Sequence, residues 1–327
     1  MRMIGYKAIN LAMNEIMDMD EKVICIGEDI NVGGAWGYLE GLYKKYGRER
    51  VIQTPISESG FTGISNGIAF GGYRPVVDFM FADFAAYAFD PIVNQAAKGR
   101  YHSKGMQNLP ITYIMPEGGG GGSGSQHSQS VEAWFANTPG LKIACPTTAA
   151  DLRSFLKASI MDSDPVLFFF ARAVAGGYPE DIDTDDQTIP SLKNAAKIVK
   201  AGADLTVVAW HRPLMNALAV AEEVEAETGK TIEVIDPRVL CPFDLEKVVA
   251  SVKKTGKALV CHEAPERGGF GTLISAWIAE NCFAEMKAPV KRLGSYNTCI
   301  PSGQPEEYAY PQKGDIKTAM LEMLNGA

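Results

Sequence analysis

The spacing of apolar residues predicts an α/β protein whose first helix is followed by a buried strand. Tyr6, Ile9, Met13 and Ile16 recur at helical spacing, and the apolar run VICIG follows at residues 23–27. Similar short runs return along the first half of the chain, namely RPVVDFMF at 74–81, PITYIM at 110–115, LKIACP at 141–146 and PVLFFF at 165–170. Near-continuous apolar strands alternating with helices are typical of a parallel sheet that is covered on both faces.

Helical stretches separate these runs. Residues 81–98 and 148–163 both have helix-like composition, and Thr148 or its neighbour is placed to cap the second of these helices. The first half of the chain is therefore predicted to be a doubly wound domain.

A polar, acidic segment divides the chain. Residues 172–192 read RAVAGGYPEDIDTDDQTIPSL, a composition typical of a connection between domains. We therefore expect a domain at 1–175, a linker at 176–193 and a smaller α/β domain at 194–327. The strands of the second domain are predicted to be DLTVVAW, TIEVIDP, KALVCHE and VKRLGS, with helices near 213–229, 244–255 and 270–284.

Composition and charge narrow the class of protein. The chain has 327 residues, which is beyond the usual size of a single core, and carries 31 basic against 39 acidic residues. No basic run could follow a phosphate backbone, so a nucleic-acid partner is not expected. The N-terminus has neither a signal peptide's apolar core nor a transit peptide's arginine bias, and no run reaches the roughly 20 apolar residues of a membrane span. We expect a soluble cytoplasmic protein with no membrane partner.

The six cysteines point in the same direction. They are scattered without a CxxC pair, and several lie in apolar runs such as VICIG. Buried thiols in a reducing compartment explain this pattern better than zinc or disulfides do.

A glycine-rich loop is the most conspicuous candidate for a binding site. Residues 117–130, EGGGGGSGSQHSQS, follow a predicted strand, and glycine lets the backbone approach a ligand closely. The loop is neither a Walker motif nor a good dinucleotide fingerprint, and a flexible linker is the alternative interpretation. His127 lies in this loop and could transfer a proton near neutral pH.

Two further segments carry acids at the ends of predicted strands. Glu58 lies in TPISESG, residues 54–60, where it could face a ligand or simply open a helix capped by Ser57 or Ser59. Glu28 and Asp29 follow VICIG and could form a turn or contact a cationic or ring-nitrogen ligand.

These motifs together resemble a known family. The chain carries, in order, GED at 27–29, TPISE at 54–58, FADF at 81–84, NQAAK at 94–98, QHSQS at 126–130, PGLK at 139–142, DP at 164–165, and HEAP followed by GGFG at 262–271. This succession resembles the beta subunits of thiamine-diphosphate-dependent 2-oxo acid dehydrogenases of the pyruvate, branched-chain and acetoin types. The resemblance implies a pyrimidine-binding domain followed by a transketolase C-terminal-type domain.

The resemblance also implies roles for individual residues. Glu58 matches the glutamate that bonds the aminopyrimidine ring of thiamine diphosphate and so favours formation of the reactive carbanion. Phe84 matches the aromatic residue stacked on that ring, Tyr87 lies in the same cofactor-binding segment, and Glu28 matches an acid near the ring. His127 matches a histidine at the thiazolium end, which acts on the substrate adduct.

A structural potassium ion is a further implication of the resemblance. Family members build this site from main-chain oxygens and one carboxylate. The counterparts here are Ile111, Ser159, Ile160, Asp162 and Asp164.

One expected motif is missing from the chain. Thiamine enzymes hold the diphosphate through Mg²⁺ bound by a GDG motif and a later asparagine, and no GDG occurs here. The chain is therefore expected to share its cofactor with an alpha subunit that anchors Mg²⁺ and the diphosphate, in an assembly of two alpha and two beta chains.

The expected reaction follows from the family. It is decarboxylation of a 2-oxo acid, or cleavage of acetoin, with acyl transfer to lipoyllysine on an acyltransferase core. Two alternatives remain from the sequence, namely the C-terminal half of a split transketolase and a noncatalytic docking subunit.

Overall fold

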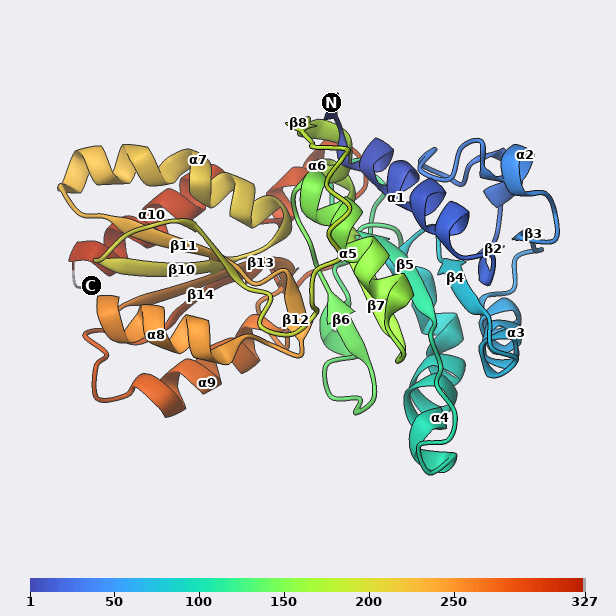
Figure 1. The fold of residues 1–327 in the computed structure, drawn as a ribbon. Coiled ribbons are helices and arrows are strands. Elements are labelled where there is room, and N and C mark those ends of the chain that lie inside the picture. Colours follow the sequence, from blue (N-terminus) through green and yellow to red (C-terminus); the bar gives the residue numbers. More distant parts are fainter. Residues whose placement is uncertain (326–327) are drawn as a thin grey trace. The chain divides into compact units, whose positions relative to one another are not determined.

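The computed structural model describes residues 1–325 and divides the chain into two compact units (Figure 1). The first unit comprises Met1–Glu117, Trp134–Ala144 and Thr148–Leu192. The second comprises Gly118–Ala133, Cys145–Thr147 and the chain from Lys193 onwards. The glycine-rich loop therefore belongs to the second unit, although the strand before it belongs to the first.

The first unit contains a parallel sheet, as the apolar runs predict. Its strands lie in the order β6, β7, β5, β4, β2, β3. In chain order they are β2 (Val23–Gly27), β3 (Val51–Gln53), β4 (Arg74–Asp78), β5 (Thr112–Glu117), β6 (Lys142–Ala144) and β7 (Val166–Ala171). Gly27 pairs with Gln53 and with Asp78, so the carboxyl ends of β2, β3 and β4 lie side by side.

Helices pack around this sheet. Helix α1 (Gly5–Met19) packs against α5 (Ala149–Met161), while α3 (Glu58–Phe70) packs against η2 (Ala82–Ala88) and η3 (Pro91–Ala96). The remaining elements are β1 (Arg2–Met3), η1 (Ile30–Val32), α2 (Leu42–Tyr46), α4 (Ala97–His102), η4 (Glu132–Trp134), α6 (Arg172–Gly177) and β8 (Glu180–Asp181).

Three of the predicted helices show how local chemistry sets their form. Ile9, Met13 and Ile16 of α1 are fully buried, which confirms the helical spacing. Thr148 caps α5, since its hydroxyl accepts the backbone N–H of Asp151 at 3.2 Å. The helix expected at 81–98 is instead a 3₁₀ turn, a π turn and α4 in succession, because Pro91 lacks the N–H that a continuous α-helix would use.

The acidic segment after α6 is anchored to the first unit. β8 pairs antiparallel with β1, and the N–H of Ile182 donates to Met1 O at 2.9 Å. Arg153 donates to the carbonyls of Asp183 and Thr184. The segment therefore continues the first unit as far as Leu192.

The second unit has a sheet of its own, in the order β14, β13, β10, β11, β9. These strands are β9 (Lys197–Lys200), β10 (Leu205–Ala209), β11 (Ile232–Asp236), β13 (Ala258–Pro265) and β14 (Lys291–Ser295). All neighbours pair in parallel except the edge strand β9, which is antiparallel. The unit also contains β12 (Val239–Cys241) and η5 (Gln304–Ala309).

Helices cover both faces of this second sheet. Helix α7 (His211–Thr228) packs against α10 (Lys313–Asn325) on one face, and α8 (Leu245–Thr255) packs against α9 (Gly271–Cys282) on the other (Figure 1). Leu214, Val220 and Met320 join strand residues such as Val207 and Val234 in the core between the sheet and the first helix pair. The three helices predicted in this half are confirmed, and α10 is an addition.

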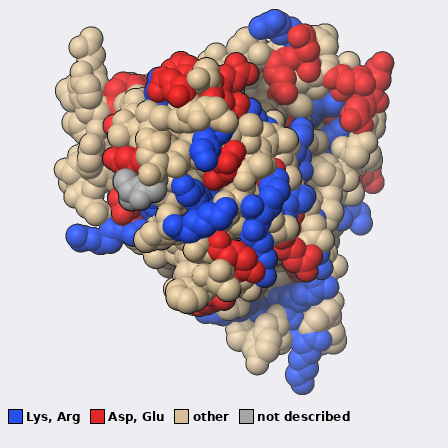
Figure 2. All heavy atoms as spheres, turned by 90° about the vertical axis from the view of Figure 1, so that its left-hand side faces the viewer, with Lys and Arg blue, Asp and Glu red and all other residues tan. Residues whose placement is uncertain are grey.

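Charged residues on the surface of the second unit are mixed in sign (Figure 2). Lys200 pairs with Glu225, and Lys317 pairs with Glu223 and Glu227. Within residues 1–325, none of the helices has the length and apolar character needed to cross a bilayer.

The cysteines are all reduced. Cys25, Cys145, Cys261 and Cys282 are buried, as expected, whereas Cys241 is half-buried and Cys299 is exposed.

Candidate functional site

The carboxyl edge of the first sheet gathers three acids. Glu28 directly follows β2, Glu58 opens α3, and Asp78 ends β4. The N–H of Thr54 donates to Gly27 O at 2.9 Å, which brings the segment leading to Glu58 next to the end of β2. The sequence pointed to Glu28 and Glu58 separately, and the sheet register places them in one neighbourhood.

Glu28 and Glu58 repel each other. Partial burial, together with the nearby charges of Asp29 and Glu58, raises the pKa of Glu28. Among residues 1–325, neither Glu28 nor Glu58 forms an ion pair. Ser57 makes no capping hydrogen bond at the start of α3, so the helix-cap interpretation of this segment lacks its main interaction.

Asp78 is a third acid of this edge, and from the sequence it was predicted only as part of a strand. Its Oδ1 accepts the hydroxyl of Tyr38 and the N–H of Met80, while its buried Oδ2 has no hydrogen-bond partner within the described part of the chain. Burial, opposed by those two hydrogen bonds and assisted by Glu28, raises the pKa of Asp78 to about 6. Its position at the carboxyl end of an apolar run was the signal available in the sequence.

Aromatic rings lie close to this edge. Phe84 lies in η2, which packs against α3, and its ring meets that of Phe81 edge-on at 5.4 Å between centroids. Phe84 is half-buried, so part of its ring can be covered by a ligand. Tyr87 is 72% exposed and points to solvent more than to the acids.

The acids and the ring suit an aminopyrimidine. Two carboxylates that repel each other, with no cation beside them in residues 1–325, favour a ligand that brings N–H donors. Phe84 adds a partly open aromatic surface next to α3. The residues present therefore fit the pyrimidine half of thiamine diphosphate.

His127 lies in the second unit, in the glycine-rich loop. It is half-buried, and its backbone N–H donates to Gly124 O at 3.2 Å. The next residue, Ser128, is held at two points, because its hydroxyl bonds Glu306 and its carbonyl accepts the hydroxyl of Tyr310 at 2.6 Å. The backbone that carries His127 is thus fixed, contrary to the flexible-linker interpretation.

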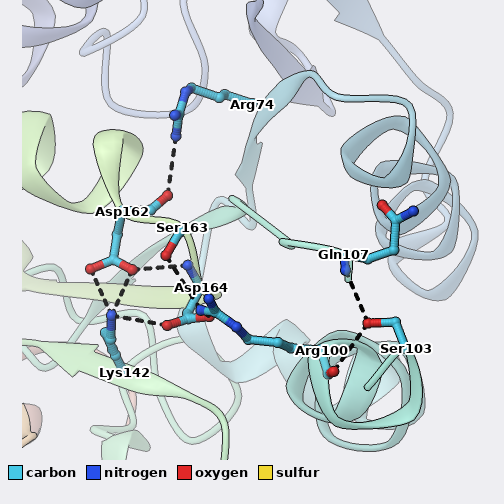
Figure 3. A network of polar contacts seen from close by, with 8 residues as sticks. All are labelled: Arg74, Arg100, Ser103, Gln107, Lys142, Asp162, Ser163 and Asp164. Atoms are coloured by element: carbon cyan, nitrogen blue, oxygen red, sulfur yellow. Dashed lines mark hydrogen bonds and ion pairs between the residues drawn. The ribbon is translucent and has the colours of Figure 1, made fainter. Parts of the chain in front are cut away.

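Lysine and arginine side chains lie among the residues expected at the potassium site (Figure 3). Lys142 Nζ lies 2.6 Å from Asp162 Oδ1 and 3.3 Å from Asp164 Oδ2, and Arg100 Nη1 lies 2.6 Å from Asp164 Oδ1. The carboxylates that would balance a metal charge are therefore already paired. Within residues 1–325, no group of three or more His, Cys, Asp or Glu residues could hold a metal ion.

The main-chain oxygens of that site are also engaged. Arg74 Nη1 donates to Ile160 O at 3.0 Å and to Asp162 O at 3.1 Å. The carbonyls of Ile111 and Ser159 accept backbone N–H groups. A potassium ion at this site would therefore have Lys142 and Arg74 as close neighbours, and their positive charges would repel it.

Each half of the chain matches the model of a known protein family. Residues 4–176 match the pyrimidine-binding domain of transketolase, and residues 194–316 match the C-terminal domain of transketolase.

Three curated relatives align along most of the chain. The 2-oxoisovalerate dehydrogenase subunit beta of Bacillus subtilis is 38% identical and covers 97% of each chain. The mitochondrial 2-oxoisovalerate dehydrogenase subunit beta of Dictyostelium discoideum is 41% identical over 90% of this chain and 80% of its own. The mitochondrial pyruvate dehydrogenase E1 component subunit beta-1 of Arabidopsis thaliana is 40% identical over 95% and 86%.

A solved structure shares the fold. A split-gene transketolase, described as an inactive beta4 tetramer, aligns with a TM-score of 0.79 at 24% identity and covers 99% of this chain and 98% of its own. At that identity the likeness concerns the fold alone.

Proposed function

Because this chain belongs to the beta subunits of the 2-oxo acid dehydrogenases, we propose that it acts with an alpha subunit and thiamine diphosphate in the oxidative decarboxylation of a 2-oxo acid. The observation that carries the proposal is the pair Glu28 and Glu58, two acids with no cation beside them in residues 1–325, at the edge where β2, β3 and β4 end. The acyl product would pass to lipoyllysine on an acyltransferase core. The relatives are named for 2-oxo acids, which favours such a substrate over acetoin.

Glu58 is the proposed catalytic acid–base residue of the first unit. Thiamine diphosphate, when bound, would supply the carbon nucleophile that makes decarboxylation possible. Glu58 would share a proton with a nitrogen of the pyrimidine ring through its carboxylate. Glu28 would keep negative charge beside that proton, and the half-exposed ring of Phe84 would stack on the pyrimidine. Tyr87 is proposed as a peripheral cofactor contact, because it is largely exposed.

His127 is the proposed proton donor to the substrate oxygen. An imidazole on a well-held loop can give or take a proton near neutral pH. The hydrogen bonds of Ser128 fix the backbone one residue beyond it. His127 would thereby serve decarboxylation or the acyl transfer that follows.

An alpha subunit is the proposed partner. The chain lacks a GDG motif, so the Mg²⁺ and diphosphate anchor must come from elsewhere. Helix α3 also exposes an apolar surface, with Ile64 60% and Phe70 46% exposed, and Gly63 and Gly67 have no atoms within 4 Å of where a Cβ would stand. Such a surface suits close packing of another chain. Two alpha and two beta chains are the proposed assembly.

We also propose the domain division drawn from the sequence. The pyrimidine-binding domain would cover residues 1–175, a linker 176–193 and the second domain 194–327, with the linker held against the first unit by the pairing of β8 with β1 and by Arg153. The ranges of the two family models support this division. The second domain would serve subunit association and docking to the acyltransferase core.

Two other functions are less well supported. A split transketolase shares the fold, but the high-coverage relatives at 38% to 41% identity are named as dehydrogenase subunits. A noncatalytic docking subunit would give no functional reason for the neighbouring carboxylates of Glu28 and Glu58 at the end of a sheet.

Replacing Glu58 with Gln in the complex with the alpha subunit tests the proposal. We expect turnover of the 2-oxo acid to fall about a hundredfold or more, because Gln cannot share the ring proton as a carboxylate does. Glu49→Gln is the matched control, since Glu49 is an exposed acid of the same unit. Unchanged turnover in Glu58→Gln would contradict the proposal and favour the docking subunit.

A further inference from the structure

The glycine-rich loop encloses the carboxylate of a residue distant in sequence. Glu306 Oε2 accepts the N–H groups of Gly120 at 2.9 Å, Gly121 at 3.1 Å and Gly122 at 2.8 Å. Its Oε1 accepts the N–H of Ser123 at 3.1 Å and the hydroxyl of Ser128. Five donors of one loop therefore converge on one side chain.

The conformation of the loop explains this convergence. Gly118, Gly120, Gly122 and Gly124 all have positive φ, between 65° and 110°, and they alternate with residues of negative φ. Alternation of this kind turns successive N–H groups toward one side and forms a concave site for an anion. The repeated glycines of the sequence are thus required by the backbone at every second position.

The anion is supplied by the chain itself. Glu306 is 2% exposed and lies in η5 of the same unit. Burial opposes its charge, but hydrogen bonds from Ser128 and from the loop amides outweigh burial and lower the pKa of Glu306. The carboxylate therefore stays ionised at neutral pH and holds the loop through charge-assisted bonds.

The neighbourhood of η5 reinforces the contact. Tyr310 donates to the carbonyl of Ser128 at 2.6 Å, and the N–H of Gly303 donates to Gly122 O at 2.9 Å. A Cβ on Gly119 would lie 2.4 Å from the ring of Tyr310. The loop and the segment 302–310 are therefore packed too closely to shift separately.

We infer that Glu306 is a positioning residue for His127, acting through the glycine-rich loop and Ser128. The inference rests on the proposed role of His127. Glu306 itself contacts no reacting group in this assignment. It fixes where the backbone presents the imidazole, and a misplacement of about 1 Å at a catalytic group can lower turnover on the order of a hundredfold.

Hydrogen exchange of the intact chain tests the clamp without reference to catalysis. In Glu306→Gln the amide group of the side chain offers N–H where the loop needs an acceptor, so residues 118–131 should exchange faster than in the wild type. Glu307→Gln is the matched control, because Glu307 is the adjacent residue, is half-exposed and pairs with Arg212 rather than with the loop. Unchanged exchange in Glu306→Gln would overturn the inference.

Turnover in the complex with the alpha subunit tests the link to His127. We expect Glu306→Gln to lower kcat about tenfold or more with KM for the 2-oxo acid within about twofold, and the double variant with His127→Ala to be no slower than His127→Ala alone. Multiplicative losses, or an unchanged kcat in Glu306→Gln, would overturn the inference.

The experiments distinguish failure of the proposed function from failure of the inference about Glu306. If His127→Ala alone keeps full turnover, the role of His127 is refuted, and with it the positioning role of Glu306, while exchange still reports on the clamp. Should Glu306→Gln fail to fold, Ser128→Ala removes one donor to Glu306 and should loosen the loop in the same direction. Unchanged exchange and kcat in Ser128→Ala would then overturn the inference.

Discussion

Asp78 shows how one buried acid makes stability depend on pH. Its pKa is raised to about 6, mainly by burial, so the folded chain prefers the protonated form. Protonated Asp78 contributes to the free energy of unfolding below the ordinary pKa of an aspartate, and this contribution is lost as pH rises through 6. Near neutral pH the native protein therefore carries a carboxylate that destabilises it, next to Glu28.

Asp78→Asn should remove this pH dependence. The difference between the folded and the ordinary pKa corresponds to about 3 kcal/mol at most. The free energy of unfolding of the variant should therefore rise by up to that much, relative to the wild type, between pH 4 and 7.5. Urea unfolding of both proteins across this range measures the difference. As a control, Asp185→Asn changes an exposed acid and should show the same dependence of the free energy of unfolding on pH as the wild type. If the curve for Asp78→Asn ran parallel to that of the wild type, the raised pKa of Asp78 would be contradicted.

Lys142 neutralises two aspartates that would otherwise suit a metal (Figure 3). Lys142→Met keeps an unbranched side chain that is one atom shorter, but leaves Asp162, whose side chain is only 15% exposed, without its ammonium partner. We expect a loss of about 1–3 kcal/mol in the free energy of unfolding, between the values for exposed and fully buried pairs. Lys7→Met, which removes an exposed pair with Glu40, should cost under about 0.5 kcal/mol.

Salt comparison adds a second readout at this site. The wild type should unfold at the same temperature in KCl and in NaCl of equal concentration, because Lys142 and Arg74 already contact oxygens of residues expected to hold potassium. A stabilisation specific to potassium would show that the ion binds despite these side chains.

At the scale of the element, the N-terminal residues of α5 and α3 differ in their hydrogen bonds, although both carry a hydroxyl. Thr148 accepts the N–H of Asp151, whereas Ser57 makes no capping bond. Thr148→Ala should therefore lower the free energy of unfolding by about 1 kcal/mol, and Ser57→Ala should change it by less than half as much. Thermal unfolding followed by circular dichroism compares the two, and equal losses would contradict this difference.

At the scale of the whole molecule, the proposed function assigns only part of the cofactor site to this chain. Glu28, Glu58 and Phe84 are proposed to bind the pyrimidine, and the sequence contains no GDG motif for the Mg²⁺-bound diphosphate. Titration calorimetry should show weak binding of thiamine diphosphate with Mg²⁺ to the isolated chain, and binding at least about tenfold tighter after the alpha subunit is added. Tight Mg²⁺-dependent binding by the isolated chain would refute the shared site.

The sequence by itself determined the fold class, most of the strands and the family. Apolar runs separated by helical stretches are local patterns, and burial then selects one parallel arrangement in each half. Glu28 and Glu58 were also visible from the sequence, each as an acid at the end of a predicted strand, although the sequence did not place them together. Pro91 altered the helix expected at 81–98, since one missing N–H changes which hydrogen bonds the following turns can make.

Only the tertiary structure decided which polar groups meet across long distances in the chain. Glu306 and Glu307 are adjacent and chemically identical in the sequence, yet Glu306 is enclosed by the glycine-rich loop, whereas Glu307 is exposed and pairs with the buried Arg212. Lys142 likewise pairs with Asp162 only because folding brings the two side chains together. Hydrogen bonds and ion pairs require contact distances, and sequence spacing does not specify which distant residues reach them.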